Sequence, residues 1–352
     1  MKHALLSVLL LLLCAAGCAE TFLVTSDLHL TADGDAHAAA LAALRDAAAK
    51  ADAVILLGDN TNNAHAEEHA RVLAFLERLD APAYVIPGNH DATREPSDFT
   101  ERYAAYGWDA AFRRDGSSAS CAVMTPGGAC LLLLDTNDAS GGFVAPLGGI
   151  APETCAWAAG VLASLPAGVP VVACGHHPIL PSERWERTPG AEALSQALRG
   201  AGLYLCGHDH GFAAVRVDGL QQITVGQPHA YPGWAGLLEV SATGLRWRVL
   251  PLYDDATRQA MRAEAAALGE GMARGTLAGT AYEGDADAIR WFTRAFDAAM
   301  ASELTPEICA RLLSEPAALK WREIETPTVV KRWIFGLLEN CPQDVRQIDI
   351  DF

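Results

Sequence analysis

The stretch VIPGNHD, residues Val85–Asp91, is an apolar run that ends abruptly in a glycine and three polar side chains. The run predicts a buried strand with polar groups at its C-terminal end. The glycine allows a sharp turn, and Asn89 offers a carbonyl oxygen that can bind a metal without adding negative charge. His90 can move a proton near neutral pH. Asp91 is placed to hold the orientation of that imidazole.

Four further predicted strands end in polar groups of the same kind. The polar groups at the five strand ends are Asp27 with His29, Asp59, Asn89 with His90, His176, and His208 with His210. The other four strands are expected at Thr21–Ser26, Ala53–Leu57, Pro170–Cys174 and Leu203–Cys206. Helices are expected at His37–Lys50 and Ala64–Leu79, between the first three strands. The repeated order of strand, polar end and helix favours an α/β sheet that binds ligands at the carboxyl ends of its strands.

The middle of the chain predicts a second sheet. Paired strands are expected at Ser120–Met124 and Ala129–Asp135, and alternating residues within Phe212–Leu252 predict antiparallel strands that complete this sheet. Helices are expected at Ser97–Tyr106, Pro152–Leu165 and Gly190–Gly202. After Tyr253 the pattern is helical, and no cluster of ligand-type residues is present there. We therefore expect residues 20–253 to form the main domain and residues 254–352 a helical C-terminal subdomain for packing or partner binding.

The first 19 residues have the layout of an export signal. Lys2 and His3 precede the apolar run Leu5–Leu13, which is too short for a comfortable transmembrane helix. Small residues before Cys18 resemble a bacterial lipoprotein box, in which the cysteine becomes the lipidated N-terminus, although Ala15 departs from the usual larger aliphatic residue. The alternative is cleavage after Ala19 and free secretion. Either way we expect an extracytoplasmic protein whose membrane contact, if any, is a lipid anchor.

Composition limits the partners of the protein. The 352 residues include 51% hydrophobic residues, enough for a substantial core, and carry a net charge of -17. This charge argues against nucleic acid as a nonspecific partner, since phosphate backbones are bound by clustered Lys and Arg.

Seven cysteines follow the leader, an odd number without a CxxC pair. Most are expected to be buried, and Cys121 and Cys130 are candidates for a disulfide across a hairpin.

Carboxylates, imidazoles and one amide, without thiolates, suit a pair of divalent cations such as Mn, Fe or Zn. Asp59 is the natural bridging ligand because it stands alone at its strand end. The motifs DLH at 27–29, GDN at 58–60, GNHD at 88–91, GHHP at 175–178 and GHDH at 207–210 occur in order. With them, the chain resembles the calcineurin-like metallophosphoesterase superfamily over roughly Thr21–Leu252.

The resemblance implies a four-layer α/β/β/α sandwich, here with a helical C-terminal appendage, and assigns roles to the strand-end residues. The first cation is expected at Asp27, His29, Asp59 and His210, and the second at Asp59, Asn89, His176 and His208. His176 is chosen over His177 because family usage puts the ligand two residues before the proline. His90 is the expected catalytic imidazole, with Asp91 as its support.

The implied activity is hydrolysis of phosphomonoesters or phosphodiesters of small molecules by a hydroxide that bridges the two cations. The alternatives are a nuclease or nucleotidase of the same superfamily, or a surface-anchored binding protein without activity. Expectations also follow for four of the histidines outside the assigned set. His177, like Asp209 and Asn63, is expected in an exposed loop rather than behind the ligands. His229 is expected to lie away from the pocket rather than to line it. His65 and His69 are expected on a helix surface.

Overall fold

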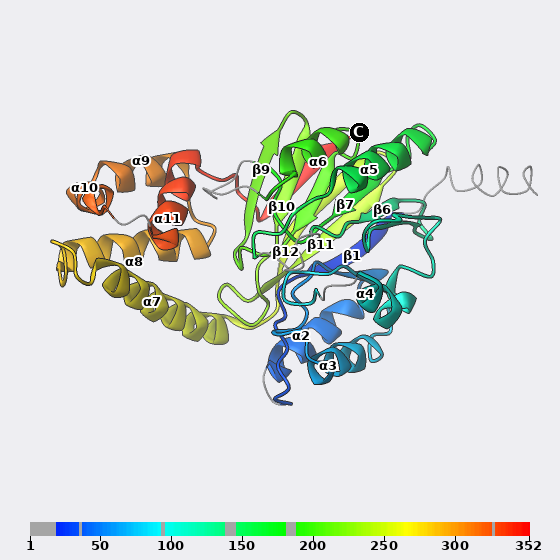
Figure 1. The fold of residues 1–352 in the computed structure, drawn as a ribbon. Helices are drawn as coiled ribbons and strands as arrows, with labels where there is room; N and C mark the ends of the chain where they lie inside the picture. The colour runs from blue at the N-terminus through cyan, green and yellow to red at the C-terminus, as the bar shows by residue number, and fades with distance from the viewer. Residues whose placement is uncertain (1–18, 35–36, 93–95, 138–145, 181–187, 326–327) are drawn as a thin grey trace, which may run out of the picture.

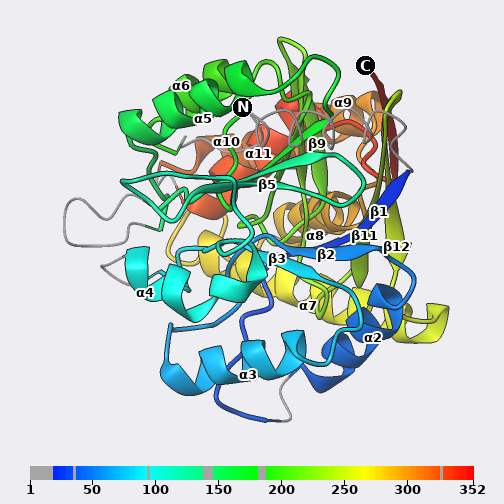
Figure 2. The same cartoon turned by 90° about the vertical axis from the view of Figure 1, so that its right-hand side faces the viewer.

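The computed structural model describes residues 19–34, 37–92, 96–137, 146–180, 188–325 and 328–352. Residues 1–18 of the expected leader, which include Cys18, lie outside these residues. Two β-sheets face each other, and helices cover the outer face of each (Figures 1 and 2). The predicted four-layer α/β/β/α arrangement is therefore confirmed.

The first sheet has six strands in the order β13-β12-β11-β1-β2-β3. Strands β1, β2 and β3 are parallel, so their carboxyl ends meet at one edge. The other three strands run antiparallel to their neighbours. Bounds are β1 Glu20–Thr25, β2 Ala53–Leu56, β3 Ala83–Val85, β11 Trp234–Ser241, β12 Gly244–Pro251 and β13 Gln347–Asp351. Helices α2 Ala38–Ala48, α3 Ala66–Leu76 and α4 Pro96–Arg102 lie on its outer side, followed by a short 3-10 turn at Ala104–Tyr106.

The second sheet has seven strands in the order β4-β5-β6-β7-β8-β10-β9. Strands β6, β7, β8 and β10 are parallel neighbours, and this again gathers carboxyl ends at one edge. Bounds are β4 Arg113–Arg114, β5 Cys121–Met124, β6 Cys130–Leu133, β7 Val171–Cys174, β8 Leu203–Cys206, β9 Ala213–Val217 and β10 Leu220–Thr224. Helices α5 Pro152–Ser164 and α6 Ala191–Ala197 cover its outer face.

Three apolar clusters hold these layers together. The central one lies between the sheets and includes Phe22, Ile55 and Leu131, each fully buried. A second fills the space between the first sheet and its helices, and a third lies under α5 and α6. Because strand residues alternate between faces, each central strand contributes to two clusters. The strands are therefore fixed on both sides, which makes their ends a rigid platform.

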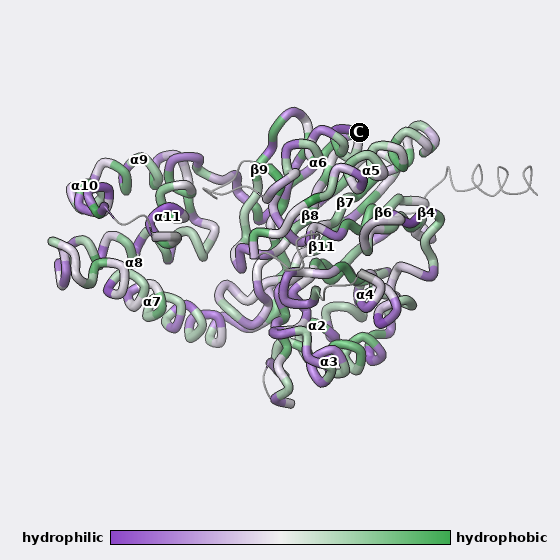
Figure 3. The backbone as a smooth tube through the Cα atoms, viewed as in Figure 1, coloured by the Kyte–Doolittle hydropathy of each residue, from purple (hydrophilic) through white to green (hydrophobic). Residues whose placement is uncertain are grey.

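The C-terminal region is helical up to Asn340 and has its own apolar cluster around Trp291, Phe292 and Trp321. Hydrophobic and hydrophilic residues alternate along α7, as expected for a helix with one packed face (Figure 3). Thr305 caps α9 by accepting a hydrogen bond from the backbone of Ile308. Bounds are α7 Asp255–Leu277, α8 Ala286–Met300, α9 Pro306–Ser314, α10 Pro316–Glu323 and α11 Val329–Asn340.

The C-terminal region was expected to be helical to its end, but its last residues form a strand. Strand β13 returns to the first sheet and pairs with β12. Val345 and Ile350 are buried in the core between the sheets, and Trp247 donates its indole hydrogen to the Val345 carbonyl (2.9 Å). The last residues thus belong to the main domain. The helices α7–α11 form an excursion whose two ends are both joined to the first sheet (Figure 1).

Two smaller expectations were wrong. The strands of 212–252 divide between the sheets, since β9 and β10 join the second sheet while β11 and β12 pair beside β1 in the first. Cys121 and Cys130 are free thiols. In the ladder Cys121 faces Leu133 and Cys130 faces Met124, and the two side chains belong to the clusters on opposite faces of the sheet. A disulfide between them is excluded by this geometry.

Candidate metal centre

The predicted strand-end residues converge where the parallel strands of both sheets end. Two groups of side chains have ligand atoms within 4.8 Å of one another: Asp27, His29, Asp59 and His210 form the first, and His176, His177 and His208 the second. The first group contains all four residues expected at the first cation. The second contains both histidines expected at the second cation, together with His177, which had been expected on the surface. We call these groups the first and second clusters.

The geometry of the first cluster fits a cation. The Nε2 atoms of His29 and His210 are 3.1 Å apart, and His210 Nε2 is 3.5 Å from Asp27 Oδ1. Imidazole nitrogens and carboxylate oxygens that approach so closely share one small space. Such a mixed nitrogen and oxygen set is typical of Mn, Fe and Zn sites.

Asp59 connects the two clusters. Its Oδ2 atom lies 3.7 Å from His29 Nε2 in the first cluster and 3.3 Å from His176 Nε2 in the second. The other oxygen, Oδ1, accepts a hydrogen bond from the backbone of His90 (2.8 Å). One carboxylate oxygen therefore faces both clusters, which is the arrangement that a ligand shared by two cations requires.

Asn89 supplies the test of fit for the second cation. Its side-chain oxygen is buried and has no hydrogen-bond partner among the described residues. A buried acceptor without a partner costs free energy, on the order of 1–3 kcal/mol. A cation bound there would satisfy it. His176 is prepared in the same way, because its Nδ1 lies 2.8 Å from the Leu57 carbonyl and the hydrogen is held there, leaving Nε2 as the ligand atom.

The backbone at the ligands is strained. Asp27, His29, Asp59, His208 and His210 all have positive φ angles, between 44° and 72°. Non-glycine residues adopt this region at a cost of order 1–3 kcal/mol each, and such residues cluster at functional sites. Five ligands with the same strain show that their positions are set by the site rather than by local preference.

The glycines in the motifs allow the strand ends to approach one another. A Cβ atom on Gly88 would lie 2.2 Å from the backbone nitrogen and Oδ1 of Asp59. A Cβ atom on Gly207 would lie 1.8 Å from the Ser26 hydroxyl and 2.7 Å from Asp27. Any side chain at these positions would push neighbouring ligands apart.

The structure corrects the role expected for Asp91. His90 Nδ1 lies 2.6 Å from the carbonyl oxygen of Asn62, so a backbone carbonyl and not Asp91 orients this imidazole. The buried Asp91 carboxylate accepts hydrogen bonds from Asn60, Thr61 and the Gly88 backbone. It ties the loop after β2 to the loop after β3. Asp91 is thus a structural anchor, while His90 stands 4.7 Å from His29, measured between ring centres.

Burial and mutual charge shift the titration of the clusters. Burial raises the pKa of Asp27 to about 7 and lowers the pKa of His29 to about 4. Burial acts to lower the pKa of His176, but the charge and hydrogen bond of Asp59, together with the charge of Asp27 and the Leu57 carbonyl, raise that pKa to about 9. Conversely, His176 holds the pKa of Asp59 below its usual range against the effect of burial. The clusters are therefore strongly coupled charges that a bound cation would stabilise.

Three histidines outside the assigned set differ from expectation. His177 is fully buried, and its Nδ1 lies 2.7 Å from the Thr136 hydroxyl. His69 is buried beside Tyr103, whose hydroxyl is 2.8 Å from its Nδ1, whereas His65 is exposed as predicted. His229 stacks on His37 with ring centres 3.9 Å apart, and its pKa is lowered to about 3 by burial and by His37, then by His29 and His210. It therefore lies near the first cluster.

Gln227 is a residue that the sequence did not single out. One end of its amide lies 2.8 Å from Nδ1 of His210. The available signal was the polar segment Gly226–His229, which follows β10 just as the motifs follow the other strands.

Asn63 is exposed as predicted and binds Glu68 through its backbone and side chain. Asp209 is half-buried.

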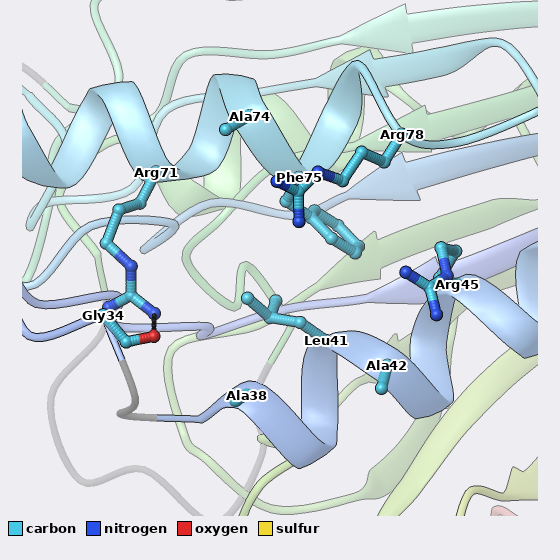
Figure 4. A pocket seen from close by; sticks show the side chains of 9 residues that line it. All are labelled: Gly34, Ala38, Leu41, Ala42, Arg45, Arg71, Ala74, Phe75 and Arg78. Atoms are coloured by element: carbon cyan, nitrogen blue, oxygen red, sulfur yellow. Dashed lines mark hydrogen bonds between the residues drawn. The ribbon is translucent and has the colours of Figure 1, made fainter.

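A separate groove of about 300 Å³ lies between α2 and α3 (Figure 4). Arg45, Arg71 and Arg78 line it, and none of the predicted site residues does. Arg71 donates to the carbonyl oxygens of Thr31, Asp33 and Gly34. Its role is thus to hold the segment that follows His29.

Residues 20–212, more than half of the chain, match the calcineurin-like phosphoesterase family. The chain therefore belongs to this family. A comparison with curated proteins found no match. Within the described residues, no helix combines the length and apolar character needed to cross a membrane.

Several solved structures are similar to this chain, and at a TM-score of 0.50 the first of them shares its fold. A purple acid phosphatase from yellow lupin seeds is 11% identical with a TM-score of 0.50, and the match covers 68% of this chain and 52% of that one. The chain thus spans about half the length of the lupin protein. A putative 5'-nucleotidase from Staphylococcus aureus is 16% identical with a TM-score of 0.46, covering 70% and 58% of the two chains. A phosphopantetheinyl hydrolase from Mycobacterium tuberculosis is 18% identical with a TM-score of 0.39, covering 64% and 96%.

Proposed function

We propose that the protein is a phosphoesterase that uses two divalent cations to hydrolyse phosphate esters of small molecules. The observation that carries this proposal is the position of Asp59 Oδ2 between His29 and His176. A shared carboxylate between two imidazole-rich clusters is what a dinuclear site needs, and membership of the family supports the same activity.

The ligands divide between the two cations as the family motifs imply. Asp27, His29 and His210 would hold the first, Asn89, His176 and His208 the second, and Asp59 both. When bound, the cations would acidify water and neutralise the charge that develops on the phosphoryl group. The protein fixes its ligands before any cation arrives, since the His208 backbone donates to Asp27 (3.1 Å) and the His90 backbone donates to Asp59.

His90 is placed to act on the substrate. Its Nδ1 hydrogen is held by the Asn62 carbonyl, so Nε2 is the nitrogen that remains for proton transfer. We propose that protonated His90 donates to the oxygen of the leaving alcohol. A positioned general acid is worth about 10²–10⁴-fold in rate.

Turnover of model esters tests the proposal. The protein is stripped with a chelator and reloaded separately with Mn, Fe and Zn. It is then assayed with p-nitrophenyl phosphate and bis-p-nitrophenyl phosphate. We expect activity that disappears with the chelator and returns with at least one metal. Two bound cations without turnover of any ester would instead support the non-catalytic binding protein.

A nuclease or nucleotidase is the second candidate. The net charge of -17 disfavours a nucleic-acid substrate, because such substrates need a basic surface. Inclusion of nucleotides and single-stranded DNA in the same assay separates these classes. Activity on DNA that exceeded activity on small esters would reverse the preference.

Export is proposed from the sequence alone. We propose that residues 1–19 direct export and that Cys18 receives the lipid that holds the protein at the membrane surface. Incorporation of radiolabelled lipid should be lost in Cys18→Ser. Incorporation that persists in this variant would contradict lipidation at Cys18.

A further inference from the structure

The loop that follows β10 is built onto the first cluster. There is no room for a side chain at Gly226, where a Cβ atom would lie 2.9 Å from the carbonyl oxygen of His210. The Gln227 backbone donates to that same carbonyl (3.5 Å), and its side-chain amide lies 2.8 Å from His210 Nδ1. The loop therefore contacts His210 through both its backbone and a side chain.

The far end of this loop is also held. The His229 ring packs, tilted by 32°, against the ring of His37, which belongs to the segment that follows the Asp27–His29 motif. The Nδ1 atoms of His37 and His229 are buried and have no hydrogen-bond partner among the described residues, so ring contact holds the pair. The loop is thus fixed on both sides of Gln227.

His210 needs such support more than the other ligands do. Its side chain is 46% exposed, whereas those of His29 and His176 are 10% and 0% exposed. Packing alone does not fix an exposed ring, so a hydrogen bond to the second ring nitrogen is the remaining means of orienting it.

We propose that Gln227 is a positioning residue that presents His210 to the first cation. For Nε2 to bind a cation it must carry no hydrogen, so Nδ1 carries it. The Gln227 amide then accepts that hydrogen through its oxygen, which a half-turn of the amide brings to the position of the nitrogen. This inference rests on the proposed dinuclear site.

Metal binding without substrate tests the role of Gln227. Chelator-treated protein is titrated with Zn²⁺ against a chromophoric chelator. Gln227→Met has a similar length but is only a weak hydrogen-bond acceptor, and we expect it to bind one of two equivalents about 10–100-fold more weakly. Gln227→Glu retains an acceptor and should restore affinity. Gln196→Ala, a change at an exposed glutamine on α6, is the control and should match the wild type.

The outcomes separate this inference from the proposed function. Two equivalents bound equally tightly by wild type and Gln227→Met would overturn the role of Gln227 alone. So would a Gln227→Glu variant as weak as Gln227→Met. A wild-type protein that bound no cation would overturn both. Nitrogen NMR of His210 gives a second readout, because loss of the Nδ1-protonated tautomer is expected in Gln227→Met and not in Gln227→Glu.

Discussion

The two halves of the proposed metal centre are supported differently. In the second cluster His176 is fully buried, and its Nδ1 is held by the backbone carbonyl of Leu57, the residue directly after β2. In the first cluster His210 is nearly half exposed and is held by a side chain, Gln227. A backbone partner in the core cannot move without the sheet, whereas the Gln227 side chain can rotate about its own bonds while its loop stays in place. The second cation should therefore be held more rigidly, and the first should exchange more easily.

Removing the residue that the halves share should have the largest effect. Asp59→Asn takes one negative charge from between the clusters, and we expect both cations to bind more weakly by more than about 100-fold, beyond the loss typical for an outer-shell partner. Metal analysis after dialysis checks this. Full metal occupancy and full turnover in Asp59→Asn would contradict the role of Asp59 as the ligand shared by both cations.

His90→Ala should separate chemistry from metal binding. We expect near-normal metal content and a loss of about 10²-fold or more in turnover of an alkyl phosphate, because the general acid is gone. A p-nitrophenyl ester needs little protonation and should lose less. Rates on both esters, measured beside the metal content, check this, and a metal-depleted His90→Ala would show that His90 is itself a ligand.

The order of metal loss should reveal the asymmetry directly. During a stepwise chelator titration we expect the first equivalent to leave from the exposed cluster, so His210→Ala should abolish the early phase and keep the late one. His176→Ala should affect the late phase. The phases are followed by released metal per chain. Simultaneous loss of both equivalents in the wild type would contradict the difference between the halves.

The smallest expected effect is on the pH dependence of folding stability, through a buried histidine that lies outside both clusters. Burial, then Arg102, lowers the pKa of His69 from 6.5 to about 4. The unfolded chain therefore binds a proton between pH 6.5 and 4 that the folded chain refuses, so stability falls as the pH drops through this window. His69→Gln should remove on the order of 2 kcal/mol of this pH dependence. Urea unfolding at pH 7.5 and 4.5 measures it, and an unchanged pH dependence would show that His69 does not contribute.

The strand ends could be predicted because their signal is local. Each motif follows a short apolar run, and four of the five begin with glycine. The parallel arrangement of the strands then brings the ends together without further information. The seven predicted ligands lie at this edge of the sheets. The chemistry of the site was thus encoded in sequence segments of three or four residues.

The remaining errors concern contacts between distant segments. The partners of Asp91 lie in the loop after β2, which no local pattern near Asp91 identifies. Strand β13 was hidden because its alternating segment follows helices and pairs with β12, about 100 residues earlier. The buried position of His69 had a signal that was overlooked, since it shares a helix face with Val72 and Leu76, at spacings of three and seven residues.

Electron paramagnetic resonance of the Mn²⁺-loaded protein tests the central claim most directly, because two cations that share a carboxylate oxygen interact magnetically. We predict two Mn²⁺ per chain and the spectrum of a coupled pair in the wild type, with the coupling lost in Asp59→Asn. A single Mn²⁺ per chain, or two that give the spectrum of isolated ions, would contradict a centre bridged by Asp59.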